Sequence, residues 1–307
     1  MTRALIPLVL ILVIAACGGA SATTTAIVTE SPPTTVAPST EPASTTTTAS
    51  TTLPPETTTT TTTAEPDLGY PEPSAGIVDR WVPEVRATYA HDSSAFTQGL
   101  LIAAGVFYES TGLYGDSSLR RVDVTTGEVI DEVPLGDDYF GEGMALVGGD
   151  LFQLTWQEGT AFTWDAATFE PGPTFTYEGE GWGLCDEGNR LVMTDGSASL
   201  EFRDPVTFEP IGEIAVTLEG APVVRLNELE CVGGLVFANV WQTTDIVVVD
   251  PATGEVTAVI DAAALDEWSQ GNVNAVLNGI AYDAAQGVFY LTGKLWPTMY
   301  EVVFVAE

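Results

Sequence analysis

The stretch Tyr139-Phe140-Gly141-Glu142-Gly143-Met144 contains one copy of a short pattern that occurs five times along the chain. Each copy sets polar residues, glycines or a tryptophan at the start of an apolar run. The copies are Thr97-Gln98-Gly99-Leu100, Gly141-Glu142-Gly143-Met144, Gly181-Trp182-Gly183-Leu184, Asn227-Glu228-Leu229-Glu230 and Asn278-Gly279-Ile280-Ala281. Their first residues are 44, 40, 46 and 51 positions apart, a period typical of a repeated supersecondary unit, with the propeller blade as a leading candidate.

A second repeated pattern marks turns between apolar runs. It begins with Asp and continues to Thr and Glu, in Asp123–Glu128, Asp165–Glu170, Asp204–Glu209 and Asp250–Glu255. Asp opens such a turn because its side chain accepts hydrogen bonds from backbone N–H groups ahead of it. The two series run in phase, so each unit is predicted to contain four short strands.

The fifth unit lacks the second pattern and ends after its third strand, Met299–Val305, whereas an extra strand, Pro83–Ala90, precedes the first unit. Pairing of this extra strand with the last one restores four strands and removes an exposed edge. We therefore predict an all-β fold, a five-bladed β-propeller with four-stranded antiparallel blades, whose last blade is completed by the N-terminal strand. A β-sandwich is the rival, and the two in-phase repeats disfavour it.

The N-terminal part of the chain predicts export and a tether. Residues 1–17 contain Arg3 and then 13 apolar residues, too few to span a bilayer, which needs ~20. Ile14-Ala15-Ala16-Cys17-Gly18 resembles a bacterial lipobox, which implies lipidation of Cys17 and anchoring to the outer face of a bacterial cell membrane; an ordinary secretory signal is the alternative. Residues 18–78, rich in Thr, Ser and Pro, are expected to form a disordered tether, and 79–307 the catalytic propeller.

The charge balance restricts the partners. Asp and Glu number 43 against 9 Lys and Arg, a net charge of -34, which argues against nucleic acid and anionic membrane surfaces, so membrane contact is expected through the lipid anchor alone. Cationic partners such as peptide amino termini fit this charge, although acidity also serves solubility alone. A Ser-His-Asp triad or a multi-His zinc site is hard to build with one histidine, and we interpret His91 as a strand-end residue.

One mouth of the predicted ring collects the candidate site. Successive strands of a blade are antiparallel, so the start of the first strand and the end of the second lie at the same end. That end gathers Phe96, Gln98, Phe140, Glu142, Trp156, Trp182, Asn227, Trp241 and Lys294. Diverse polar and aromatic groups in a concave mouth indicate a site, although the aromatic residues serve blade packing equally well. Lys294 is the only lysine of the chain.

An ordered set of motifs resembles the plant and bacterial glutaminyl-peptide cyclotransferase family. The set comprises Phe96–Leu100, Glu109–Gly115, Phe140–Gly143, Glu180–Leu184, Leu226–Glu230, Asn239–Trp241, Leu277–Ala281 and Leu291–Pro297. The resemblance implies a five-bladed propeller that acts on peptides and proteins with an N-terminal glutamine, cyclises it to pyroglutamate and releases ammonia. It also implies no required cofactor, and no relation to the animal-type zinc enzymes.

The resemblance assigns roles to the residues of the mouth. Glu142 is expected to take a proton from the α-amine and to return one to the leaving ammonia. Gln98, Asn227 and Lys294 are expected to hold the amide and its developing oxyanion, with Lys294 as the charge stabiliser. The aromatic side chains would form a wall that excludes water. Glu228 is expected to be engaged in backbone hydrogen bonds instead.

Two other functions stay open at this point. One is a non-catalytic binding propeller displayed on the cell surface. The other is a metal-dependent, lactonase-like propeller with Glu109, Glu142, Asn227 and Asn278 as oxygen ligands, and the resemblance does not exclude a structural Ca2+. We expect a monomer. Cys185 and Cys231 occupy equivalent places in adjacent repeats, and we expect two separate buried thiols, with a disulfide as the alternative.

Overall fold

The computed structural model describes residues 67–269 and 271–307, and this part of the chain is built from β-strands. It contains 22 strands and one short 3₁₀ helix, η1 (Ala263–Leu265). Within these residues no helix has the length and apolar character needed to cross a membrane. The predicted signal peptide, the lipidation site Cys17 and most of the predicted tether lie outside the described residues.

Three sheets contain four antiparallel strands each, in chain order. They are β2 (Thr97–Ala103), β3 (Val106–Thr111), β4 (Ser118–Asp123) and β5 (Val129–Pro134); β6 (Gly141–Val147), β7 (Asp150–Thr155), β8 (Thr160–Asp165) and β9 (Phe175–Thr176); and β10 (Leu184–Asp186), β11 (Leu191–Met193), β12 (Ser199–Arg203) and β13 (Pro210–Ala215). The first two strands of each sheet are almost entirely buried, whereas β5 and β13 are mostly exposed and carry charges.

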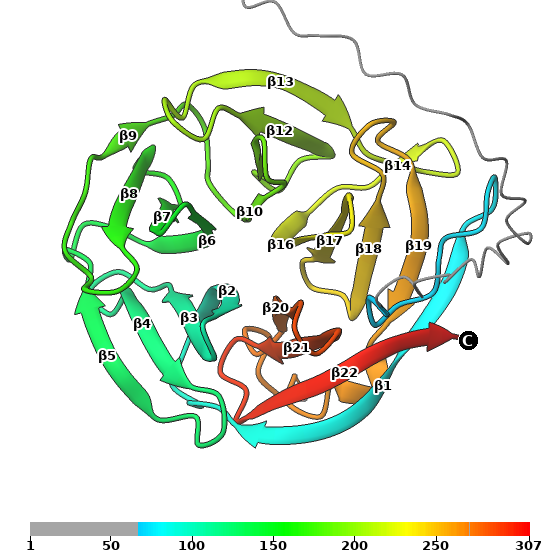
Figure 1. Cartoon of the computed structure of the whole chain (residues 1–307), viewed down its shortest axis with the longest axis horizontal. Helices are drawn as coiled ribbons and strands as arrows, with labels where there is room; N and C mark the ends of the chain where they lie inside the picture. The colour runs from blue at the N-terminus through cyan, green and yellow to red at the C-terminus, as the bar shows by residue number, and fades with distance from the viewer. Residues whose placement is uncertain (1–66, 270) are drawn as a thin grey trace, which may run out of the picture. The chain divides into compact units, whose positions relative to one another are not determined.

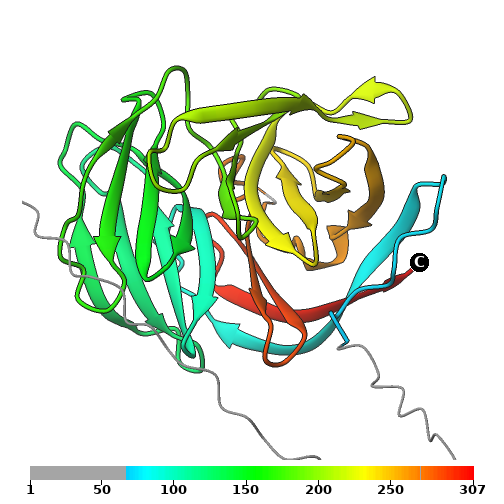
Figure 2. The same ribbon diagram turned by 45° about the horizontal axis from the view of Figure 1, so that its top comes forward.

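The other strands form one eight-stranded sheet and a small hairpin. The sheet has the order β16 (Leu226–Val232), β17 (Leu235–Val240), β18 (Asp245–Val249), β19 (Val256–Asp261), β1 (Asp79–Ala90), β22 (Thr298–Ala306), β21 (Val288–Gly293) and β20 (Leu277–Asp283), and the hairpin joins β14 (Thr217–Leu218) to β15 (Ala221–Pro222). The long β1 pairs antiparallel with β22 from Trp81 to Ala90, and parallel with β19 over Asp79–Trp81 only. The N-terminal and C-terminal strands therefore lie side by side, as Figures 1 and 2 both show.

Figure 1 shows the sheets arranged around a common centre, with β2, β6, β10, β16 and β20 innermost, a propeller-like arrangement. Glycines allow these inner strands to approach one another. A Cβ atom on Gly143 would lie 2.5 Å from the carbonyl oxygen of Trp182, and one on Gly183 would lie 2.0 Å from that of Asn227. The backbone N–H of Gly143 donates to the Trp182 oxygen at 2.7 Å. The glycines of the repeated pattern are thus required for the close packing of neighbouring sheets.

The Asp turns form as the sequence predicts. The Oδ1 atoms of Asp123, Asp165 and Asp204 each accept backbone N–H groups two and three residues ahead. Gly127 then adopts a positive φ of 70°, and Phe208 stands at the matching place with φ 60°. The left-handed backbone costs a non-glycine residue some energy. The Phe208 ring offsets this cost, because it is 1% exposed and packs 5.9 Å from the Phe152 ring.

The last part of the predicted tether packs on the sheets. The Tyr70 ring lies 5.2 Å from the Phe237 ring and 6.1 Å from the Phe289 ring, and Phe304 donates its backbone N–H to Gly69 at 2.7 Å. The boundary predicted between 78 and 79 is therefore too late for the described residues 67–78. Tyr70 is a single aromatic residue in a polar segment, which is too weak a pattern to predict an ordered segment. Its ring nevertheless supplies apolar surface that packs against Phe237 and Phe289.

The expectation of two separate thiols is wrong. Cys185 of β10 and Cys231 of β16 form a disulfide, with their Cα atoms 5.6 Å apart. That separation is ordinary for a disulfide. The glycine contacts between the first strands of neighbouring sheets bring the two cysteines within reach.

Candidate active site

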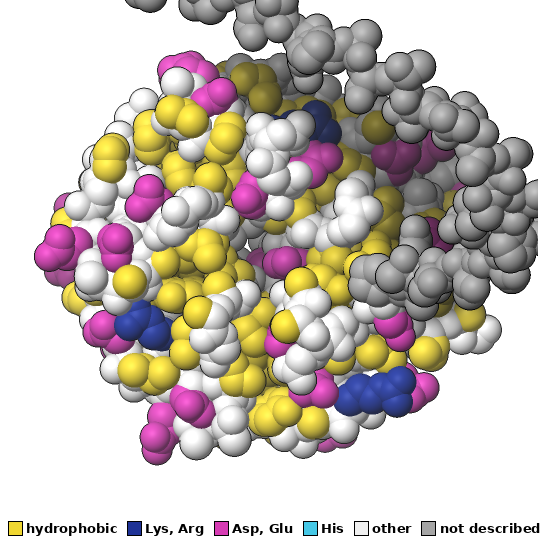
Figure 3. Space-filling model, viewed as in Figure 1, with side chains coloured by type: hydrophobic (Ala, Val, Ile, Leu, Met, Phe, Trp, Pro, Cys, Tyr) yellow, Lys and Arg dark blue, Asp and Glu magenta, His cyan; other side chains and the backbone are white. Residues whose placement is uncertain are grey.

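A cavity of about 210 Å³ opens where the inner strands begin, and all nine residues predicted for the mouth line it. It is lined by Phe96, Gln98, Phe140, Glu142, Trp156, Trp182, Asn227, Trp241, Lys294, Val273 and Asn274. The structure thus brings these nine side chains together, and Val273 and Asn274 are additions from the segment between η1 and β20. The face viewed in Figure 3 is hollowed near its centre and carries many more acidic than basic side chains.

β-Bulges aim the polar side chains at the cavity. The pairing of β2 with β3 shifts register between Thr97 and Gly99, and that of β6 with β7 shifts between Gly141 and Met144. The pairings that begin at Leu226 and Leu277 shift in the same way. A bulge bends the strand and turns a side chain away from the regular alternation. Gln98, Glu142 and Asn227 all lie at such shifts, which explains why they point into the cavity.

Glu142 is a buried carboxyl group, 5% exposed, that accepts a 2.9 Å hydrogen bond from Nε2 of Gln98. Burial raises the pKa of this carboxyl well above its usual range; the Lys294 ammonium opposes the shift, and the carboxylates of Glu180 and Glu158 add to it. A carboxyl group with a raised pKa can both accept and return a proton near neutral pH.

Lys294 follows β21 and is also 5% exposed. Its backbone is held by the Lys294 N–H bond to Val276 and by the Leu295 N–H bond to Ala95, with Leu295 in a left-handed conformation of φ 62°. Burial lowers the pKa of the ammonium to about 8, against the opposing effect of Glu142. Among the described residues no carboxylate oxygen lies within 4.0 Å of Nζ, which instead lies 4.9 Å from the Phe96 ring centre.

The aromatic residues form two groups in the wall. Phe140 packs edge to face with Phe96 at 6.1 Å and with Trp156 at 5.7 Å, while Trp182 packs against Trp241 at 5.5 Å. In the same cavity, Oε1 of Gln98 is buried without a hydrogen-bond partner in the described part of the chain. A buried acceptor without a partner is costly to the fold, so this oxygen is available to a donor on a ligand.

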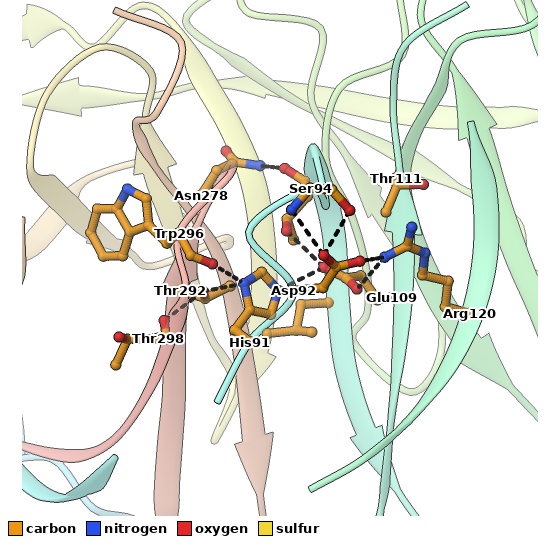
Figure 4. Close-up of polar contacts among 12 residues, drawn as sticks. His91, Asp92, Ser94, Glu109, Thr111, Arg120, Asn278, Thr292, Trp296 and Thr298 are labelled. Carbon is orange, nitrogen blue, oxygen red and sulfur yellow. Dashed lines mark hydrogen bonds and ion pairs between the residues drawn. The ribbon is translucent and has the colours of Figure 1, made fainter. Parts of the chain in front are cut away.

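His91 and Glu109 belong to a buried network of polar side chains (Figure 4). Nε2 of His91 lies 2.9 Å from Oε1 of Glu109, which also accepts from Thr97 at 2.7 Å. Burial acts to lower the pKa of His91, but the Glu109 carboxylate raises it above its usual value. His91 is therefore more than a strand-end residue. Its Nε2 forms a buried ion pair with Glu109, and its Nδ1 lies 2.6 Å from the Trp296 carbonyl oxygen.

Only two of the four oxygen ligands of the lactonase-like alternative line the cavity. Glu142 and Asn227 line the cavity, but Glu109 is bound to His91 and the Asn278 amide donates to the Thr97 carbonyl at 2.9 Å. No group of three or more His, Cys, Asp or Glu side chains suited to a metal occurs among the described residues.

The prediction for Glu228 is confirmed. Its two carboxyl oxygens accept backbone N–H groups from Leu100 at 3.3 Å and from Ile280 at 2.8 Å, in two other inner strands. Glu228 is 1% exposed and does not line the cavity.

The chain is similar to known proteins of one family. The model of the glutamine cyclotransferase family matches residues 57–304. The chain belongs to this family. A glutaminyl-peptide cyclotransferase of Arabidopsis thaliana is 40% identical over 227 residues, which cover 71% of this chain and 70% of the relative. The crystal structure of Myxococcus xanthus glutaminyl cyclase matches with a TM-score of 0.71 and 41% identity, over 75% of this chain and 100% of that chain. The resemblance drawn from the motifs is confirmed.

Four residues around the site of this cyclotransferase family member were missed from the sequence. Val273 and Asn274 lie in an irregular segment without any periodic pattern. Glu158 accepts the Tyr114 hydroxyl and the Phe140 N–H, and Glu180 accepts two indole N–H groups. Glu158 lies outside every motif of the sequence, whereas Glu180 opens the motif Glu180–Leu184 but was given no role in the site.

Proposed function

We propose that this chain is a glutaminyl-peptide cyclotransferase that converts the N-terminal glutamine of peptides and proteins to pyroglutamate and releases ammonia. Family membership supports this activity. The observation that carries it is a single buried carboxyl group, Glu142, hydrogen-bonded to an amide inside an aromatic-walled cavity. The attack is intramolecular, so the enzyme needs to fold the glutamine back and move one proton.

In the proposed reaction, the α-amine nitrogen attacks the side-chain amide carbon while the Glu142 carboxylate takes a proton from the amine. The carbonyl oxygen becomes an oxyanion, which the Lys294 ammonium and the Asn227 amide stabilise. The C–N bond to the side-chain nitrogen then breaks, and Glu142 returns its proton to that nitrogen, which leaves as ammonia. The proton count balances, and the carboxylate is regenerated.

The other cavity residues have supporting roles in this proposal. Gln98 orients Glu142 through its NH₂ group and offers its unpartnered oxygen to a substrate N–H. Phe96, Phe140, Trp156, Trp182 and Trp241 exclude water, and their faces can hold the amine before it loses its proton. No resident cofactor has a role in these steps.

We propose a five-bladed propeller as the architecture, with the last blade formed by β20, β21, β22 and β1. The antiparallel pairing of β1 with β22 supports closure by the N-terminal strand. The parallel contact of β1 with β19 covers three residue pairs, so we assign β16–β19 to a separate blade.

We also propose a monomeric, exported protein anchored by lipid on Cys17. Replacement of Cys17 by Ser should move the protein from the membrane fraction to the soluble fraction. Unchanged membrane retention of that variant would reject the anchor.

The activity is tested by incubating the protein with a short peptide that begins with Gln. Cyclisation removes ammonia, so mass spectrometry should show a loss of ~17 Da that depends on the proton transfer by Glu142. Peptide binding without this loss would favour a binding propeller instead. Activity that disappears with a chelator and returns with Ca2+ would favour a metal-dependent site.

A further inference from the structure

Glu180 holds two walls of the cavity with one oxygen. Its Oε2 accepts the indole N–H of Trp156 at 2.8 Å and that of Trp182 at 3.0 Å. Its Oε1 accepts the side-chain N–H of Gln157 at 2.9 Å. Both carboxylate oxygens are therefore engaged, and we call these four residues the Glu180 clamp.

The clamp joins two sheets at the cavity. Trp156 follows β7 of the second sheet, whereas Glu180 and Trp182 precede β10 of the third. Backbone bonds fix the main chain on both sides, because Gly181 donates to the Trp156 carbonyl at 2.9 Å and Gly143 donates to that of Trp182 at 2.7 Å. These backbone hydrogen bonds fix the main chain without the Glu180 carboxylate. The clamp in addition fixes the orientation of the two indole rings.

Glu180 stays ionised at neutral pH. Burial acts to raise its pKa, but the hydrogen bonds from Gln157, Trp182 and Trp156 outweigh this effect and lower it. Hydrogen bonds to a charged acceptor are shorter and about twice as strong as neutral ones. A half-buried carboxylate that accepts three such bonds can therefore hold both indoles in one rotamer.

Resting on the proposed function, we propose that Glu180 is a positioning residue for cyclisation. It acts through Trp156 and Trp182, which it locks as fixed walls around the folded-back glutamine. Folding back places the amine near the amide carbon, and a displacement of about 1 Å can cost on the order of 100-fold in rate. Rotation of either indole would widen the space and let the substrate take unproductive positions.

The decisive variants separate the geometry of the clamp from its charge. Glu180→Leu removes all three bonds and should lower kcat/KM roughly 10- to 100-fold, mostly in kcat, because the indoles lose their positions. Glu180→Gln keeps one carbonyl oxygen for the indoles and should lose less. Glu178→Gln is the control, because Glu178 is an exposed acid two residues away.

A spectroscopic readout tests the clamp without any activity. The chain has seven tryptophans, so its indole N–H signals can be assigned in a ¹H–¹⁵N spectrum with Trp156→Phe and Trp182→Phe. Glu180→Gln should shift these two signals and leave that of Trp164 in place, while Glu178→Gln shifts neither. This result stands even if wild-type protein proves inactive, so failure of the proposed function is recognised separately.

Two outcomes would overturn the proposal. One is that the Trp156 and Trp182 indole signals do not move in Glu180→Gln, which would show that Glu180 does not bind these indoles in solution. The other is wild-type kcat/KM in a folded Glu180→Leu variant with both signals shifted, which would make the clamp irrelevant to turnover. If Glu180→Leu does not fold, the Glu180→Gln spectrum and its kcat/KM relative to Glu178→Gln decide.

Discussion

Replacement of Glu142 by Gln tests the proton transfer most directly. Glu and Gln have nearly the same shape, and the amide oxygen of the new side chain can still accept the bond from Nε2 of Gln98. The fold and the cavity should therefore survive. What is lost is a group that accepts and returns a proton near neutral pH.

The size of the effect follows from the lining of the cavity. A positioned general acid/base contributes about 10²–10⁴ in rate, or roughly 2.7–5.4 kcal/mol at 1.36 kcal/mol per decade. Glu142 is the only carboxyl group among the described residues that line the cavity. No neighbour can take over its role, so we expect a loss in the upper half of that range, in kcat and not in KM.

The same substitution should not lower stability. Because the folded-state pKa of Glu142 is raised, its contribution to stability is present at low pH and is lost as pH rises through that pKa. Gln has no such loss. The melting temperature of Glu142→Gln should equal or exceed that of wild type, and the difference should grow with pH.

Ammonia release from a Gln-peptide gives kcat, and circular dichroism gives the melting temperature. Glu228→Gln is the matched contrast, because it exchanges one of the two oxygens that accept buried backbone N–H groups outside the cavity, so kcat should be retained. Near-normal kcat in Glu142→Gln together with collapse in a folded Glu228→Gln would falsify the assignment.

Three further perturbations test the charges and the disulfide. Lys294→Met should lower kcat more than it raises KM, because a charge that meets the oxyanion acts mainly in the transition state; a rise in KM alone would make Lys294 a binding residue. The kcat/KM profile should rise with pH above the ordinary carboxylate range as Glu142 ionises, and fall beyond about 8 as the Lys294 ammonium is lost. Persistence of that alkaline fall in Lys294→Met would assign it to another group. Cys185→Ser should lower the free energy of unfolding by about 2–4 kcal/mol, as expected for a disulfide that closes a loop of 46 residues, measured by denaturant titration without reductant; an unchanged midpoint would mean that the bridge does not stabilise the fold.

The strands and the mouth could be predicted from sequence because both depend on local, repeated rules. The short pattern at the start of an apolar run recurs in every unit, and the Asp turn recurs in four of the five. Antiparallel pairing then decides which strand ends lie at the same mouth of the ring. Gln98 and Glu142 were found in this way, although the bulges that aim them left no mark in the pattern.

The missed features depend on distances between units. Whether Cys185 reaches Cys231 depends on how closely two inner strands approach, which no single repeat encodes. The same holds for Glu180, whose partner Trp156 lies in the preceding sheet, and for Glu109, whose partner His91 lies outside the repeats. Tyr70 orders its segment only because an apolar surface built from distant strands receives it.

The pairing of β1 with β22 also affects how the molecule can be made. Of the described strands, β1 is completed first during synthesis and its main partner, β22, is completed last. Until β22 emerges, β1 has only a three-residue contact with β19, and its remaining backbone groups are open to pairing with other chains. Contacts between such distant segments make folding slow and leave unpaired edges prone to aggregation. A nascent chain arrested before Thr298 would expose both the long β1 and the outer edge of β21, so premature termination near the C-terminus should be far more damaging than the few missing residues suggest.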